Sequence, residues 1–218
     1  MEIVWLGHAC FRIRGREATV VCDPCPPNTG YSYGKPTADI VTVSSHDPAH
    51  NYTKGVTGKP VVLENPGEYE ISGAFITGIP TDNTSSEKGE KSANGRNISF
   101  VVEMEDIKVV HLGGLNHTPT AEQVEDMVGC DVLLVPVGGK KTLDGAKAAE
   151  VVSLLEAKLV VPMHFKTEAH DGGLDTPDRF LKEMQVTSVE PQVKLQINKS
   201  AIPSEAQVVM LNYKGQDS

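Results

Sequence analysis

The order of the expected elements restricts the fold of this chain more than any other feature. Up to residue 110 the chain is dominated by short apolar or β-branched runs separated by Gly-, Pro- and Asp-rich turns, a pattern typical of strands. Strands are expected at 3–6, 10–13, 18–22, 40–43, 61–63, 69–71, 75–79, 98–104 and 107–110. The first half is therefore expected to be dominated by strands.

Beyond residue 110 strands and helices alternate. Thr120 and Gln123 fit a capping box that opens a helix. A second helix is expected over 144–157, and a third over 176–184 with Thr176 as its N-cap and Pro177 in its first turn. Further strands are expected at 132–135 and 159–161, and near Val193 and Val208. With no linker visible, the pattern predicts a single α/β domain over 1–218, two packed sheets with helices outside, that is, an αββα sandwich.

Charge and hydropathy restrict the partners. The formal net charge is -9 and no dense Lys/Arg cluster occurs, so neither nucleic acid nor an anionic membrane surface is an expected partner. No apolar run approaches a membrane span of about 18 residues, and the N-terminus lacks a secretion signal, which makes the cytoplasm the expected location. The polar stretch 82–96 has almost nothing apolar to bury, so we expect it to be poorly ordered.

Histidines follow three of the expected strands. Strand 40–43 leads into a loop with His46 and His50, strand 107–110 leads into His111, and strand 159–161 leads into His164. Because polar loops at the ends of adjacent strands form the sites of α/β enzymes, we expect these strand ends to meet at one cleft. The alternative is that each histidine caps a strand or lies on the surface. Further residues are expected to line the cleft: His8, Gly114 and His117, with Lys140, Lys141 and His170 as candidates for its rim.

Several short segments together resemble the metallo-β-lactamase superfamily, in particular its small stand-alone metal-dependent hydrolases related to the ascorbate-phosphate lactonases. The resemblance covers nearly the whole chain and implies the αββα metallo-β-lactamase fold. The segments that carry it are Leu6-Gly-His-Ala-Cys-Phe11, Asp23-Pro24, the strand and loop at 40–51, Pro66-Gly-Glu-Tyr-Glu70, His111-Leu-Gly113, Val135-Pro-Val-Gly-Gly139 and Pro162-Met-His164.

The resemblance also shows what is missing. The family binds two metal ions through a His-x-His-x-Asp-His motif, but Ser45, Asp47 and Ala49 stand at its first three ligand positions and only His50 is retained. Sliding the alignment by one residue places His46 at the first position and worsens the rest. No histidine occurs near 81–83, where the family has another ligand, and Gly114 replaces the bridging carboxylate, whereas the last ligand is retained as His164.

Two cations held close together need carboxylates to offset their repulsion, so Ala49 and Gly114 argue against a dinuclear centre. At most one zinc or other divalent ion is expected, at Asp47, His50 and His164 with His46 as a further candidate ligand. The favoured hypothesis is a pseudo-hydrolase that binds an unidentified small molecule or protein. The alternative is a hydrolase of a phosphoester or lactone with an atypical single-metal site, and a homo-oligomer is compatible with either.

Cys22 and Cys25 have the spacing of a redox or metal-binding pair. The prolines that follow Cys25 favour an extended loop over the helix that a thioredoxin-like site needs, and no second pair completes a zinc clip. Coincidental spacing is therefore the preferred interpretation.

Overall fold

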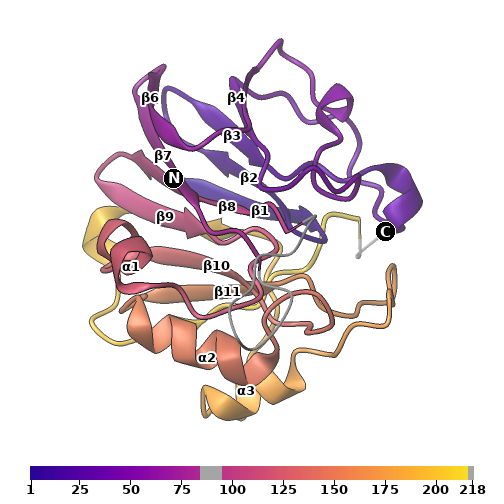
Figure 1. Cartoon of the computed structure of the whole chain (residues 1–218), viewed down its shortest axis with the longest axis vertical. Helices are drawn as coiled ribbons and strands as arrows, with labels where there is room; N and C mark the ends of the chain where they lie inside the picture. The colour runs from indigo at the N-terminus through magenta and orange to yellow at the C-terminus, as the bar shows by residue number, and fades with distance from the viewer. Residues whose placement is uncertain (84–94, 216–218) are drawn as a thin grey trace.

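Two β-sheets lie face to face in the computed structural model, which describes residues 1–83 and 95–215 (Figure 1). The first sheet has the strand order β12 (Leu195–Gln196), β1 (Glu2–Gly7), β2 (Cys10–Arg14), β3 (Thr19–Cys22), β4 (Ile40–Thr42) and β5 (Val61–Leu63). The second has the order β13 (Gln207–Val208), β11 (Leu159–Met163), β10 (Val132–Pro136), β9 (Ile107–His111), β8 (Ile98–Met104), β7 (Ala74–Pro80) and β6 (Gly67–Ile71).

Side-chain alternation explains why the first sheet is covered on both faces. In β1, Ile3 and Trp5 point into the main core between the sheets, whereas Val4 and Leu6 point into a smaller core on the outer face. The smaller core is closed by Tyr31 and other side chains of the loops that follow β3 and β4, which contain the 3-10 helices η1 (Pro27–Thr29) and η2 (Thr53–Gly55). Irregular loops thus form one outer layer of the sandwich.

Three helices of the described part of the chain form the other outer layer, beside the second sheet (Figure 1). They are α1 (Ala121–Met127), α2 (Gly145–Leu154) and α3 (Asp178–Glu183); a further 3-10 helix, η3 (Lys199–Ala201), precedes β13. The capping box of Thr120 and Gln123 is confirmed. For α3 the expected cap was wrong: Pro177 is the N-cap, and the Thr176 hydroxyl donates to the Asp178 carboxylate instead of accepting from the helix.

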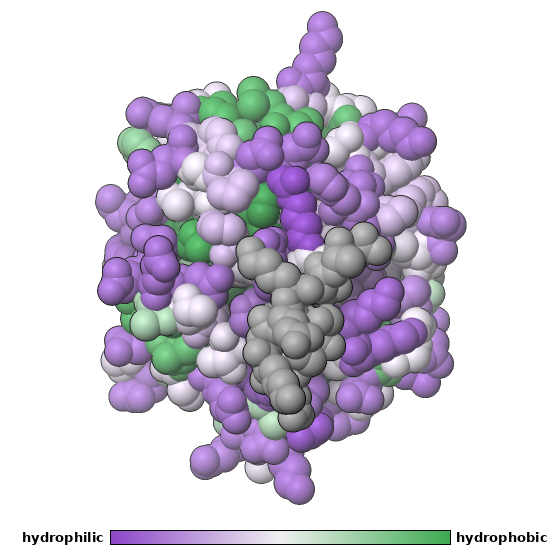
Figure 2. Space-filling model, in the orientation of Figure 1, coloured by the Kyte–Doolittle hydropathy of each residue, from purple (hydrophilic) through white to green (hydrophobic). Residues whose placement is uncertain are grey.

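The predicted fold is confirmed, with small shifts of element ends. α2 stops at Leu154, before the expected end at 157, and the strand expected near Val193 lies at β12. Most of the segment 82–96 falls on 84–94, outside the described residues, so its expected disorder stays a prediction. Among the described residues no helix is long and apolar enough to cross a membrane. The face seen in Figure 2 is mainly hydrophilic, with an apolar group at its upper margin.

Candidate metal centre

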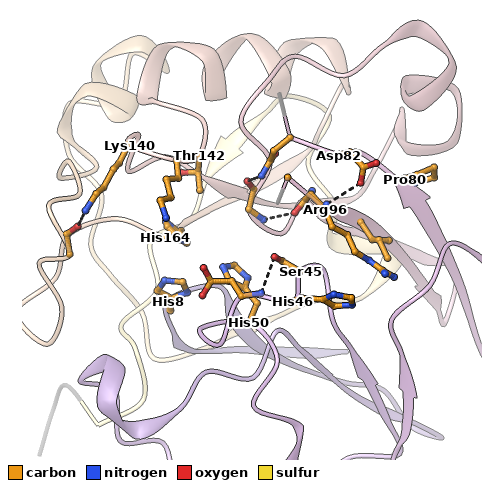
Figure 3. A pocket seen from close by; sticks show the side chains of 18 of the residues that line it. His8, Ser45, His46, His50, Pro80, Asp82, Arg96, Lys140, Thr142 and His164 are labelled. Carbon is orange, nitrogen blue, oxygen red and sulfur yellow. Dashed lines mark hydrogen bonds between the residues drawn. The ribbon is translucent and has the colours of Figure 1, made fainter. Parts of the chain in front are cut away.

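Three histidines from distant parts of the sequence meet at one edge of the sandwich. His8 lies in the turn between β1 and β2, His50 in the loop after β4, and His164 directly after β11. The ring centroids of His8 and His164 are 4.2 Å apart, those of His8 and His50 5.0 Å, and those of His50 and His164 5.8 Å. All three side chains are buried, and one ligand atom of each lies within 4.8 Å of the others (Figure 3).

The backbone is held in an uncommon conformation at this cluster. His8 and His164 have φ of 54° and 52°, and Asp23, which contacts His50, has φ of 42°. The left-handed region costs an L-residue about 1–2 kcal/mol. The strained turns are fixed from outside: the Trp5 indole donates to the His8 carbonyl at 3.0 Å, and the His164 amide donates to the same carbonyl at 3.2 Å. Strain that the fold maintains around three polar side chains is typical of a functional site.

Asp23 orients His50. Its fully buried carboxylate accepts hydrogen bonds from the Ser44 amide at 2.7 Å, the Ser44 hydroxyl at 2.5 Å and His50 Nδ1 at 2.6 Å. Burial lowers the pKa of His50, but the adjacent Asp23 carboxylate outweighs it and the net shift is upward. Burial likewise raises the pKa of Asp23, which the His50 ring reverses to a net lowering. With Nδ1 carrying the hydrogen toward Asp23, the His50 Nε2 lone pair faces the cluster.

His8 and His164 are held in the neutral form. Burial, followed by the neighbouring histidines, keeps the pKa of His8 well below its ordinary value and lowers that of His164 to about 3. The Nδ1 atoms of both rings are buried without a hydrogen-bond partner among the described residues. A buried nitrogen without a partner is costly, and a metal ion is one group that satisfies it.

The donor set fits a single divalent cation. Three neutral imidazoles are the ligand set of one class of catalytic zinc site, which keeps its fourth position open. Tetrahedral zinc with bonds of about 2.1 Å holds its ligand nitrogens about 3.4 Å apart, so the cluster needs side-chain movements of only about 1 Å to close on an ion. In the described residues this is the one group of three or more His, Cys, Asp or Glu ligand atoms that lie this close together.

The cluster lies at the wall of a large pocket of about 1010 Å³. Charged groups from three loops line it: Asp47 after β4, Asp82 and Arg96 between β7 and β8, and Lys140 and Lys141 after β10. The pocket is also lined by His46, His170, Asn65, Asn83, Asn97, Thr142, Gly114 and Leu174. Its polar, charged lining suits a small polar ligand.

The structure divides the expected ligands into two groups. His50 and His164 belong to the cluster, whereas His46 and Asp47 are exposed residues of the pocket wall. One Asp47 oxygen accepts from the Ala49 amide at 2.9 Å, which ties the carboxylate to its own loop. Ser45 lines the pocket at the position of a family ligand.

Of the residues expected to line the cleft, His8 and Gly114 do so, whereas His111 and His117 do not. His111 is fully buried, and its Nε2 bonds the Ala9 carbonyl at 2.8 Å, because the β9 side chain turns into the sandwich instead of toward its edge. The three strand ends nevertheless converge as expected, because Gly114, just beyond β9, lines the same pocket as His50 and His164. Only the His111 side chain points elsewhere.

Gly114 lies next to the cluster. A Cβ built on it would lie 3.8 Å from His50 Cε1 and 3.9 Å from His50 Nε2, both ordinary contact distances. The position given by the family resemblance for a carboxylate thus faces His50, and the space for a side chain is open.

His8 and Asp23 were not recognised as members of the cluster from the sequence. The available signal was a histidine placed within the otherwise uncharged, mainly apolar run from Ile3 to Phe11, where a strand turn brings it to the sheet edge. Cys22 and Cys25 do not form a pair despite their spacing. Cys22 packs in the main core, and Cys25 packs in the outer core with Cys10.

Comparisons with known proteins agree with this geometry. Residues 2–164 match the family described as "Beta-lactamase superfamily domain". A metal-dependent hydrolase from Methanoculleus marisnigri is 31% identical over 77% of this chain and 82% of its own length. A protein of the same description from Methanopyrus kandleri is 26% identical over 88% and 95%.

Among solved structures, one from Thermotoga maritima, described as a candidate Zn-dependent hydrolase of the metallo-β-lactamase superfamily, has a TM-score of 0.79. It is 39% identical and covers 96% of this chain and 97% of its own. A metallo hydrolase from Ignicoccus hospitalis, 18% identical with a TM-score of 0.67 over 90% of this chain and 99% of its own, shares the fold.

Proposed function

The chain belongs to the β-lactamase superfamily, and we propose that it is a hydrolase with a single divalent metal ion held by His8, His50 and His164. Zinc is the proposed ion, because three imidazole nitrogens suit its borderline-soft character and tetrahedral preference. The proposed substrate is a phosphoester or a lactone that fits the polar pocket.

One observation carries the proposal: three buried imidazoles converge, and the buried Nδ1 atoms of His8 and His164 have no hydrogen-bond partner among the described residues. From the sequence, only His50 and His164 were recognised as retained metal ligands of the family, and this favoured a pseudo-hydrolase. His8 adds the third nitrogen donor that a catalytic zinc site requires.

The residues around the cluster have separable roles. Asp23 accepts the Nδ1 hydrogen of His50 and so keeps Nε2 free to bind. His170, whose ring centroid lies 5.8 Å from that of His8, is the group we assign to accept a proton from the attacking water. When bound, the cation supplies Lewis acidity, which polarises a substrate oxygen and lowers the pKa of water.

A second candidate is the pseudo-hydrolase that keeps the pocket for ligand binding. It is favoured by Ser45, Ala49 and Gly114, which leave the family's metal motif without one imidazole and two carboxylates. The two candidates differ in whether a bound metal turns over substrate.

The test is element analysis of protein purified without tag or chelator, followed by assays on phosphodiester and lactone panels. About one equivalent of zinc and hydrolysis that is lost in His164→Asn support the proposal. Asn is chosen because it tolerates the left-handed backbone at this position. Metal binding without turnover, or no metal with retained ligand binding, would instead support the pseudo-hydrolase.

A further inference from the structure

An open space lies beside His50 at Gly114. A side chain at Gly114 would meet Asn97 Oδ1 and His50 Nε2 at 3.8 and 3.9 Å, so nothing there blocks one. The backbone is fixed on both sides, since its amide donates to Asn97 Oδ1 at 2.8 Å and its carbonyl accepts from Asn83 Nδ2 at 2.9 Å. The glycine therefore leaves a defined space of side-chain size at the cluster, open to the pocket.

The described lining of the pocket that contains this space has one more basic than acidic side chain, in contrast to the net charge of -9 of the whole chain. The described pocket lining holds Arg96, Lys140 and Lys141 against Asp47 and Asp82. Figure 3 shows Lys140 and Arg96 on opposite sides of the histidines. Lys140 Nζ donates to the Gly172 carbonyl at 2.5 Å, which fixes its position on the pocket wall. The three imidazoles add no negative charge, and the Asp23 carboxylate behind His50 offsets only one positive charge. A bound divalent ion would therefore leave an excess of positive charge at the site.

We propose that the ligand of this site carries an oxyanion, a carboxylate or a phosphate, which occupies the space over Gly114 beside His50. The oxyanion supplies from the ligand the negative charge that Ala49 and Gly114 cannot supply from the chain. Arg96, Lys140 and Lys141 attract it into the pocket. This rests on the proposed function for the metal, whereas the basic side chains and the space belong to the chain itself.

The proposal requires that metal and anion bind cooperatively. Coupling between two sites is reciprocal, and typical coupling energies correspond to about 5–150-fold in affinity. We expect metal-loaded protein to bind inorganic phosphate or acetate at least about 10-fold more tightly than metal-free protein does.

Two substitutions at one position separate charge from volume. Gly114→Asp places a carboxylate in the space, so metal affinity should rise and anion affinity of the metal-loaded protein should fall by about 10-fold or more. Gly114→Asn has nearly the same volume without the charge; it should lower anion affinity but leave metal affinity below that of Gly114→Asp. Circular dichroism checks that both variants fold.

The experiment is calorimetric titration of phosphate, acetate and neutral urea into metal-loaded and metal-free protein, with metal affinity measured separately by chelator competition. Tighter binding of phosphate than of acetate identifies a phosphate ligand, and the reverse identifies a carboxylate. Equal anion affinity in wild type and Gly114→Asp overturns the inference, as does binding of urea as tight as that of either anion.

The outcomes also separate this inference from the proposed function. If wild type binds metal and anions bind no better than urea, the proposed function stands and the inference fails. If wild type binds no metal, the proposed function fails. The titrations of metal-free protein then test the anion site by itself, since Lys141→Gln should weaken phosphate binding if the anion binds in this pocket. The control is Lys147→Gln, on α2 outside the pocket, which should leave phosphate binding unchanged.

Discussion

Replacing Asp23 by Asn tests how the cluster is built. The two side chains have the same shape, and Asn is among the residues that tolerate the φ of 42° at this position. The amide oxygen can still accept from the Ser44 amide. The amide nitrogen, however, is a donor, and facing His50 Nδ1 it reverses the tautomer so that Nε2 carries the hydrogen and has no lone pair for a metal.

The magnitude follows from the three hydrogen bonds that the Asp23 carboxylate accepts. A hydrogen bond to a charged group contributes about 1.5–3 kcal/mol, against about 1 kcal/mol for a neutral one. All three bonds lose their charged acceptor and the one from the Ser44 amide remains as a neutral bond, so Asp23→Asn should lower the free energy of unfolding by about 2–4 kcal/mol. Loss of such an outer partner also typically weakens metal binding by about 10–100-fold.

The matched control is Asp131→Asn. Asp131 is also buried, and its carboxylate accepts from the Lys108 amide at 2.9 Å and from Lys199 Nζ at 2.7 Å, away from the pocket. It should lower stability by about 1–3 kcal/mol and leave zinc affinity unchanged. Stability is measured by urea unfolding and zinc affinity by chelator competition. A folded Asp23→Asn protein with the zinc affinity of wild type would refute the role assigned to Asp23.

Three further predictions concern separate features. His8→Asn should abolish stoichiometric zinc binding whereas His46→Ala should not, as element analysis would show, and the reverse result would return His46 to the ligand set. Burial keeps His164 neutral with a pKa of about 3, so below about pH 6.5 the unfolded chain binds the proton and the folded one does not. As the pH falls from about 6.5 to 3, this residue should lower the unfolding free energy of metal-free protein by up to about 1.4 kcal/mol per pH unit. Urea unfolding of His164→Asn should show a slope smaller by this amount, because the buried His8 keeps its own contribution. Burial raises the pKa of Cys22 and Cys130 to about 12, so both thiols should resist a thiol reagent at pH 8 until urea unfolds the protein; fast labelling of native protein would contradict this.

The fold could be predicted because its signals are local or repeated. Alternation in the strands and the capping box at Thr120 each depend on a few neighbouring residues. The cap of α3 failed because Thr176 has a local competitor in the Asp178 carboxylate. Local preferences of this kind cannot be ranked without coordinates.

The site was harder because it depends on contacts between residues far apart in the sequence. His8 and His164 meet since the His164 amide bonds the His8 carbonyl, a contact between two sheets that no sequence spacing encodes. Asp47 looked like a ligand by its position in the motif, yet its carboxylate bonds its own loop at Ala49. A motif specifies which residues are near in sequence, but the direction of each side chain depends on packing.

The same geometry limits the site to one ion. Two divalent ions about 3.5–4 Å apart repel by roughly 15–20 kcal/mol even at an effective dielectric constant of 20. In carboxylate-bridged centres the ligand charges offset this repulsion, but the ligand atoms that converge here belong to three imidazoles, which carry no negative charge. A lone ion meets no such repulsion, and its charge is offset by whatever anion enters over Gly114. Gly114→Asp alone should therefore strengthen one site without creating a second, and an uptake of two zinc ions by that variant would contradict the electrostatic argument.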